Sequence, residues 1–96
     1  SLTTAIWSEL GVGNISADRR DLQRTYLDRM ERLVVNPVSG TPADARAVAR
    51  WELTQLRDGI DSALLGVSDV YTQAHLFEAR ARINKTLDAG LEAERN

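Results

Sequence analysis

Three short stretches of turn-forming residues divide this chain into four segments, and each segment repeats apolar residues at helical spacing. The stretches are 11–14 (GVGN), 36–42 (NPVSGTP) and 66–68 (GVS). Glycine, proline, asparagine and serine at this density interrupt regular structure. We find no convincing strand pattern in any of the four segments. The chain is therefore expected to fold into helices alone.

The second segment predicts a helix from Ser16 to about Val35. The Ser16 hydroxyl can accept a hydrogen bond from a free amide of the first turn. Asn36 precedes Pro37, and a residue before proline is driven out of the helical conformation, which ends the helix. Apolar residues spaced by four, four and three positions mark the face expected to be buried: Leu22, Tyr26, Met30 and Leu33, broadened by Leu27 and Val34.

The third segment opens with the sequence TPAD at 41–44, the sharpest local signal in the chain. Thr41 is expected to cap this helix, and Pro42 suits its first position because the missing amide needs no partner there. The helix should end near Leu65. Gly59 either costs about 1 kcal/mol relative to alanine, if it is exposed, or lets a neighbouring helix approach closely. The expected buried face contains Ala45, Val48, Ala49, Leu53, Leu56, Ile60, Ala63 and Leu64.

The fourth segment predicts a helix that Ser68 caps, with Asp69 in its first turn. The helix should run to about Ala89, and Gly90 is its expected stop, with residues 91–96 as a frayed end or a short continuation. Its buried face is expected to contain Leu76, Ala79, Ile83 and Leu87, widened by Ala74, Phe77 and Ala81.

The first segment, Thr3 to Leu10, is too short to be stable alone and must dock on something larger, with Trp7 as its anchor. The three longer helices, joined by short loops, should pack as antiparallel neighbours. We therefore predict an all-α fold, an up-down-up bundle of three long antiparallel helices with a short N-terminal helix packed across it. The expected core is Leu22, Tyr26, Leu53, Leu56, Ile60, Leu76, Ile83 and Leu87.

The chain length of 96 residues suits one domain, 1–96. Because the sequence starts at Ser1 and not at methionine, we expect this domain to be a fragment of a larger protein. Hydrophobic residues make up 43% of the chain and charged residues 27%, which is an ordinary globular composition. No run of residues reaches the roughly 20 apolar positions that cross a bilayer, so no membrane contact is expected. The absence of cysteine excludes disulfides and cysteine-ligated zinc and leaves the compartment open.

Arginines cluster on the second segment, where they could read phosphate oxygens. The formal net charge is −2, however, and acidic residues interleave with the arginines. Opposite charges one turn apart, such as Asp28 and Arg32, are typical of a solvated helix face with ion pairs. We therefore expect no nucleic-acid partner. The arginines are Arg19, Arg20, Arg24, Arg29 and Arg32.

The one histidine of the chain, His75, lies one turn before Glu78. A helical zinc site of the HExxH type needs two histidines one turn apart and a third ligand elsewhere, which this chain cannot supply. His75 is better interpreted as an edge residue that hydrogen-bonds a neighbour or solvent. Without a second histidine a hydroxyl nucleophile also lacks its usual base. We predict no catalytic residue, no metal ligand and no cofactor in this chain.

Trp51 lies off the main apolar line of its helix, so two interpretations remain. It could be an exposed anchor for a partner, or it could pack under the first helix against Trp7, which we favour because a short helix needs such a platform. Residues that could contact another domain or partner are Trp7, Trp51, Tyr71 and His75.

Three segments, RRDLQRTYLDRMERLV (19–34), DARAVARWELTQLRDGID (44–61) and YTQAHLFEARARINKTLD (71–88), carry a family resemblance. In order, they resemble the C-terminal helical region of large bacterial zinc-dependent metalloproteases of the HExxH type, often described as domains of unknown function. The shared features are Leu-Gln-Arg at 22–24, the alanine-rich stretch ARAVARWEL and the closing AHL with ARIN. All of these are helix-packing features and none is a catalytic signature.

The resemblance implies that zinc and its ligands belong to an upstream domain of a hydrolase parent, which would be periplasmic or extracellular. This chain would then be a non-catalytic accessory domain that packs against the remainder of the protease. The alternative is a freestanding helical adaptor that binds a protein or peptide in a groove. The substrate of such a parent and the oligomeric state have no signal in the sequence.

Overall fold

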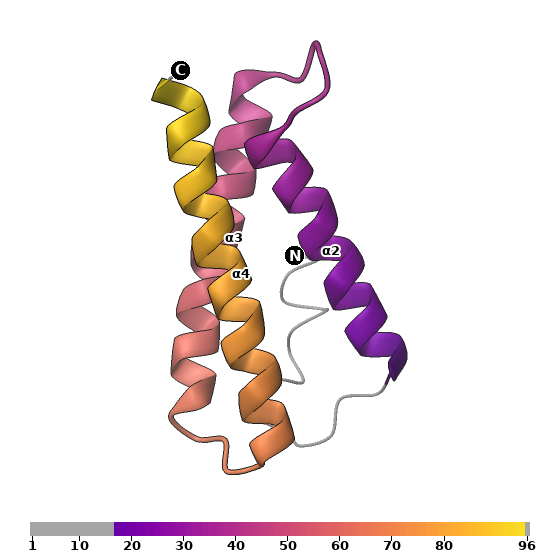
Figure 1. The fold of residues 1–96 in the computed structure, drawn as a ribbon, viewed down its shortest axis with the longest axis vertical. Helices are drawn as coiled ribbons and strands as arrows, with labels where there is room; N and C mark the ends of the chain where they lie inside the picture. Colours follow the sequence, from indigo (N-terminus) through magenta and orange to yellow (C-terminus); the bar gives the residue numbers. More distant parts are fainter. Residues whose placement is uncertain (1–16, 96) are drawn as a thin grey trace.

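The computed structural model describes residues 17–95, with side chains described over 20–92. This part of the chain forms three α-helices, α2 (Ala17–Val35), α3 (Ala43–Leu64) and α4 (Val70–Arg95). They lie side by side in an elongated bundle, and no strand occurs between residues 17 and 95 (Figure 1). The predicted all-α helical bundle is confirmed. The short helix predicted at residues 3–10, which includes Trp7, lies outside the described residues.

The loop before α3 uses different hydrogen bonds from those expected of a Thr41 cap. Pro42 occupies the N-cap position in an extended conformation and makes no side-chain cap. The Thr41 hydroxyl instead donates to the Val38 carbonyl at 2.6 Å and closes the loop. Gly40 has a φ of 88°, a left-handed conformation that glycine adopts without strain. The helix was predicted to start at Pro42 and starts one residue later, at Ala43, and the predicted Thr41 cap was wrong.

Asp69, and not Ser68, caps α4. The Asp69 Oδ2 atom accepts hydrogen bonds from the Thr72 hydroxyl at 2.6 Å and from the Thr72 amide at 2.8 Å. These two bonds favour the ionised carboxylate and lower the pKa of Asp69. The residue directly before the helix, Asp69, therefore caps it, and the predicted Ser68 cap was wrong.

Gly59 and Gly90 both lie inside helices, and the structure decides which of them allows a close helix approach. Gly90 was expected to end α4, yet the helix continues through it to Arg95. A Cβ atom at Gly90 would overlap the side chain of Val34, which is fully buried on α2. Gly59 has nothing within 4 Å of the place where its Cβ would lie. The close helix approach therefore occurs at Gly90 and not at Gly59.

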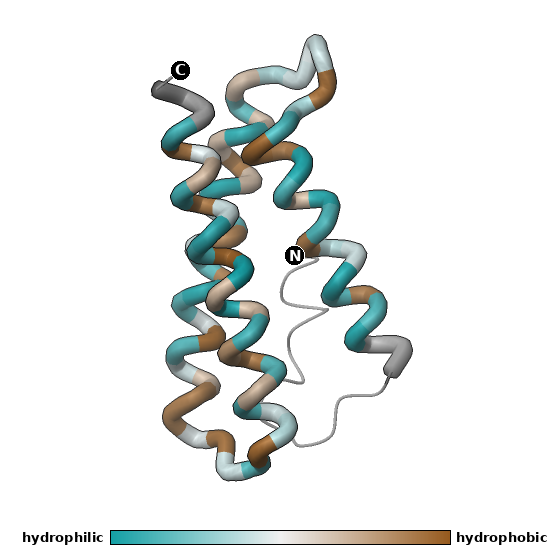
Figure 2. Tube along the Cα trace, in the orientation of Figure 1, coloured by the Kyte–Doolittle hydropathy of each residue, from teal (hydrophilic) through white to brown (hydrophobic). Residues whose placement is uncertain are grey.

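The hydrophobic core lies between the three helices and contains most of the residues that their apolar stripes predicted. Figure 2 shows apolar residues recurring along each helix between hydrophilic ones. The buried apolar side chains are Tyr26, Leu27, Met30, Val34, Ala49, Leu53, Leu56, Ile60, Val67, Leu76, Ala79 and Ile83, with Leu33, Ala63, Leu64 and Leu87 packed against them.

Leu22 was expected in the core and is 49% exposed. Each four-residue step along an α-helix rotates the side chain by about 40°, so two steps from Met30 place Leu22 about 80° away from the middle of the buried face. Val48 and Phe77 were also expected to be buried and are exposed. The Phe77 ring is partly covered by the guanidinium of Arg80, which lies 5.0 Å from the ring centroid. Ala74 and Ala81, which were expected to widen the buried side of α4, are exposed as well.

Polar contacts between the helices define their register. Between α2 and α3, Val34 contacts Arg46 and Tyr26 contacts Glu52, so residue numbers rise on one helix as they fall on the other. Between α3 and α4, Arg57 contacts Asn84 and Asp61 contacts Arg80, with the same opposite order. Residue numbers rise together in the contacts of α2 with α4: Gln23 with His75, Asp28 with Arg82, and Val34 beside Gly90. The N-terminal halves of α2 and α4 therefore face each other.

Candidate functional site

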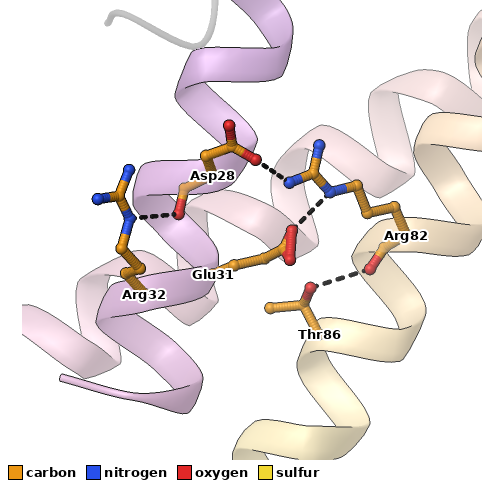
Figure 3. A network of polar contacts seen from close by, with 5 residues as sticks. All are labelled: Asp28, Glu31, Arg32, Arg82 and Thr86. Atoms are coloured by element: carbon orange, nitrogen blue, oxygen red, sulfur yellow. Dashed lines mark hydrogen bonds and ion pairs between the residues drawn. The ribbon is translucent and has the colours of Figure 1, made fainter.

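A charged network joins the middle of α2 to the middle of α4 (Figure 3). Arg82 of α4 donates through Nη2 to the Asp28 carboxylate and through Nε to Glu31 Oε2 at 2.5 Å. Arg32 bonds the backbone carbonyl of Asp28 at 3.4 Å, so the expected ion pair between Arg32 and the Asp28 carboxylate is replaced by the pair with Arg82. Although burial alone would lower the pKa of Arg82, the two carboxylates raise it. This network holds α2 and α4 in register.

Between one and two turns closer to the helix N-termini, a second polar contact joins the same two helices. Gln23 of α2 is only 1% exposed, and its Oε1 atom lies 2.6 Å from His75 Nε2. Because Oε1 only accepts hydrogen bonds, Nε2 must carry the proton and donate. The expectation that His75 hydrogen-bonds a neighbour agrees with this geometry. A buried amide and an imidazole thus form a fixed polar floor between α2 and α4.

A groove of about 300 Å³ lies above this floor, between the N-terminal halves of α2 and α4. We call it the α2/α4 groove. In Figure 1, α2 leans away from the other helices toward its N-terminal end, where the groove is found. Its charged and hydrogen-bonding lining consists of Arg20, Gln23, Arg24, Tyr71, His75, Glu78 and Arg82.

Burial and the charges that line the groove shift the pKa of His75. Burial is the largest influence and lowers the pKa of His75, since it disfavours the charged imidazolium. The positive charges of Arg20 and Arg24 lower this pKa further, and the negative charge of Glu78 opposes them. His75 is therefore held as the neutral imidazole at neutral pH.

His75 and Glu78 were considered as a metal site and set aside. The Nε2 atom of His75 is directed at Gln23, which supplies an amide oxygen and not a carboxylate or a second imidazole. Within residues 17–95, no group of three or more His, Cys, Asp or Glu side chains is placed to hold a metal ion. The residues present do not fit a zinc centre.

A second surface lies on the other side of α2, against α3. A shallow groove of about 430 Å³ is lined mainly by apolar side chains, and we call it the α2/α3 groove. Val48 on its rim is 55% exposed, and Trp51, one helical turn further along α3, is 63% exposed. The groove is lined by Met30, Leu33, Pro42, Asp44, Ala45, Val48, Ala49 and Glu52.

The four residues named as contact candidates fall in different places. Tyr71 and His75 both line the α2/α4 groove, where Tyr71 is 78% exposed on the rim. Trp51 lies beside the α2/α3 groove, and the packing against Trp7 that we favoured involves a residue outside the described part of the chain. Sequence reasoning missed Gln23, Arg20 and Arg24 as groove residues. Only the spacing of Arg20 and Arg24, one turn apart on one edge of α2, could have indicated them.

No helix of the described chain is long and apolar enough to cross a membrane. Comparisons of this chain with models of known protein families, with curated proteins and with solved structures found no match.

Proposed function

We propose that this chain is a non-catalytic helical accessory domain that packs against the remainder of a larger protein. The observation that carries the proposal is the exposed apolar surface of α3, where Val48 and Trp51 lie one turn apart beside the α2/α3 groove. Tryptophan is enriched among the residues that contribute most to protein interfaces, and contiguous exposed apolar groups mark contact sites. The role of the domain in this proposal is structural.

The larger protein in this proposal is a bacterial zinc-dependent metallopeptidase of the HExxH type. This part rests on the resemblance of the segments 19–34, 44–61 and 71–88 to the C-terminal helical region of such enzymes. Zinc, its ligands and the general-base glutamate would all belong to the upstream catalytic domain. Such a parent would be periplasmic or extracellular.

The proposal includes the complete architecture of the domain. The three helices would form an up-down-up bundle, and residues 3–10 would form a short helix packed across it. In this arrangement Trp7 and Trp51 would lie near the seam between the short helix and the bundle. The register of the contacts among α2, α3 and α4 supports the order of the three long helices.

A freestanding helical adaptor is the second candidate. The mainly apolar lining of the α2/α3 groove favours it, because amphipathic helices of partner proteins bind in such grooves. The two candidates differ in what precedes the chain in the gene. An upstream HExxH segment in the same reading frame supports the accessory domain, whereas a start codon directly before Leu2 supports the adaptor and contradicts the accessory domain.

The packing surface is tested in the intact protein by Trp51→Ala, with Leu65→Ser as the control. Leu65 is an equally apolar exposed residue in the loop between α3 and α4. In the isolated chain both variants should shift the melting temperature by no more than about 4 °C, as expected for surface substitutions. In the intact protein Trp51→Ala alone should speed limited proteolysis at the junction before this domain. Equal proteolysis of both variants would contradict the assigned surface.

A further inference from the structure

The side chains that line the α2/α4 groove include more positive than negative charges, although the whole chain is acidic. Its lining carries the positive charges of Arg20, Arg24 and Arg82 and the single negative charge of Glu78, whereas the chain has a formal net charge of −2. Charge complementarity at an interface selects a partner of opposite sign. The groove is therefore suited to an anionic group.

Two of the three arginines are available to such a group. Arg82 is already bound by two carboxylates. Arg20, by contrast, makes no ion pair or hydrogen bond with any residue that the structure describes. Among the residues that the structure describes, Arg24 pairs with Asp21, at 3.8 Å and with both side chains more than two-thirds exposed. An ion pair of that length and exposure contributes little and is easily exchanged for a better partner.

The floor of the groove is held by hydrogen bonds, so a bound group would meet a preformed site. Gln23 is buried and joined to His75, and Arg82 is fixed at the inner end by the network with Asp28 and Glu31. Tyr71 stands on the rim with its ring exposed. Tyrosine and arginine are the residue types that protein interfaces favour. Preformed polar groups also bind more tightly because little freedom is lost on binding.

We propose that the α2/α4 groove binds an acidic segment of a protein partner, with Arg20 and Arg24 holding its carboxylates and Tyr71 contacting its backbone or an adjacent side chain. Guanidinium groups bind carboxylates through paired, charge-assisted hydrogen bonds. Arg20 and Arg24 lie one helical turn apart on an exposed edge of α2, so the carboxylates of neighbouring acidic residues can each meet one guanidinium. This spacing favours an Asp- or Glu-bearing polypeptide over a single phosphate. The α2/α4 groove and the α2/α3 groove beside Trp51 lie on opposite sides of α2, so each proposal can be contradicted without the other.

The single histidine makes the test direct, because the imidazole signals of His75 need no assignment in an NMR spectrum. The labelled 96-residue chain is titrated at low ionic strength with acetylated, amidated tetraglutamate, with tetraglutamine, and with inorganic phosphate. Tetraglutamate should shift the His75 and Arg20 side-chain signals and raise the pKa of His75, since a nearby carboxylate favours the imidazolium. Tetraglutamine should leave these signals in place.

Two pairs of charge-neutralising variants separate a site from general attraction. Arg20→Gln with Arg24→Gln should weaken tetraglutamate binding about tenfold. Arg29→Gln with Arg32→Gln removes the same charge from exposed positions of the same helix and should weaken binding less than about twofold. Glu78→Gln removes the competing carboxylate and should tighten binding by about two- to threefold. All five residues are exposed, and unchanged circular dichroism would confirm that the variants fold.

Three results would overturn the proposal. The first is that tetraglutamate leaves the His75 signals unmoved. The second is that the two arginine pairs weaken binding equally, which would indicate attraction to the whole helix and no groove site. The third is that inorganic phosphate binds more tightly than tetraglutamate, which would reassign the groove to a phosphorylated ligand.

Discussion

The two sides of α2 meet their neighbours through different chemistry. Toward α4, the contacts are a buried amide on an imidazole, an arginine between two carboxylates, and a glycine pressed against a valine. Toward α3, two hydrogen bonds, from Tyr26 to Glu52 at 2.9 Å and from Arg46 to the Val34 carbonyl at 3.2 Å, lie among mainly apolar side chains. Polar groups bond only in matched positions, whereas apolar groups tolerate sliding. The α4 side of α2 therefore carries the charged and the buried polar contacts, whereas the α3 side is mainly apolar.

The largest effect should come from closing the space that Gly90 leaves for Val34. Gly90→Ala adds a methyl group where α4 meets a fully buried side chain, and overpacking of this kind costs about 1–3 kcal/mol of unfolding free energy. Urea unfolding of the variant measures this loss. Gly59→Ala is the matched control, because its methyl group meets nothing and should stabilise α3 by up to about 1 kcal/mol. If both alanines stabilise the protein, the close approach of α4 to α2 is not real.

Tyr26→Phe tests the α3 side and should have the next largest effect. The substitution removes the hydroxyl that donates to Glu52 and keeps the buried ring. A hydrogen bond to a charged group contributes about 1.5 kcal/mol, reduced here because the carboxylate is partly exposed. The unfolding free energy should therefore fall by about 1 kcal/mol. A Glu52→Gln variant combined with Tyr26→Phe should add little more, and full additivity of the two changes would contradict a direct bond.

Arg82→Met tests the charged network on the α4 side. Methionine keeps the apolar stem of the side chain and removes its bonds to Asp28 and Glu31. Partly exposed ion pairs contribute little, so we expect a loss of about 0.5–1 kcal/mol at low salt. The distinguishing measurement is the salt dependence: added salt should weaken the wild-type protein more than the variant. Parallel salt curves for the two proteins would show that the network adds no stability.

The smallest effect should be the pH dependence that His75 introduces. Its pKa in the folded chain lies below the usual 6.5, because burial and the charges of Arg20 and Arg24 outweigh the opposing charge of Glu78. A lowered folded-state pKa means that the neutral form stabilises the fold above pH 6.5 and that this stability is lost as the pH falls through the folded-state value. His75→Gln should flatten the stability curve between about pH 8 and pH 5.5. An equally steep curve in the variant would place the titrating group elsewhere.

The sequence predicted the helices well because a buried helix face repeats its apolar residues along one segment, and that pattern needs no knowledge of neighbours. Sequence-based prediction failed for residues whose burial depends on how two helices pack together. Leu22 belongs to the apolar stripe of α2 and is nevertheless half exposed. The stripe rotates slowly around the helix, and only the positions of α3 and α4 decide where along it burial ends. The roles of Gly59 and Gly90 depend equally on which helix faces each glycine.

The groove residues were harder to predict for the same reason. Arg20 and Arg24 alternate with acidic residues along α2, a pattern that is typical of a solvated face. Their position opposite His75 follows from the register between α2 and α4, which the periodicity of a single helix does not contain. His75 was correctly interpreted as an edge residue, whereas its partner Gln23 was not foreseen because a buried glutamine has no apolar signature.

The distance along the chain between the two walls of the α2/α4 groove has a consequence for folding. Gln23 and His75 are 52 residues apart, and Asp28 and Arg82 are 54 apart, so each contact closes a loop that contains all of α3. Closing such a loop costs more chain entropy than forming the neighbouring pairs α2 with α3 and α3 with α4. We therefore expect the two walls to meet late, after both shorter hairpins have formed. Capture of an acidic ligand would then report that the last step of folding is complete.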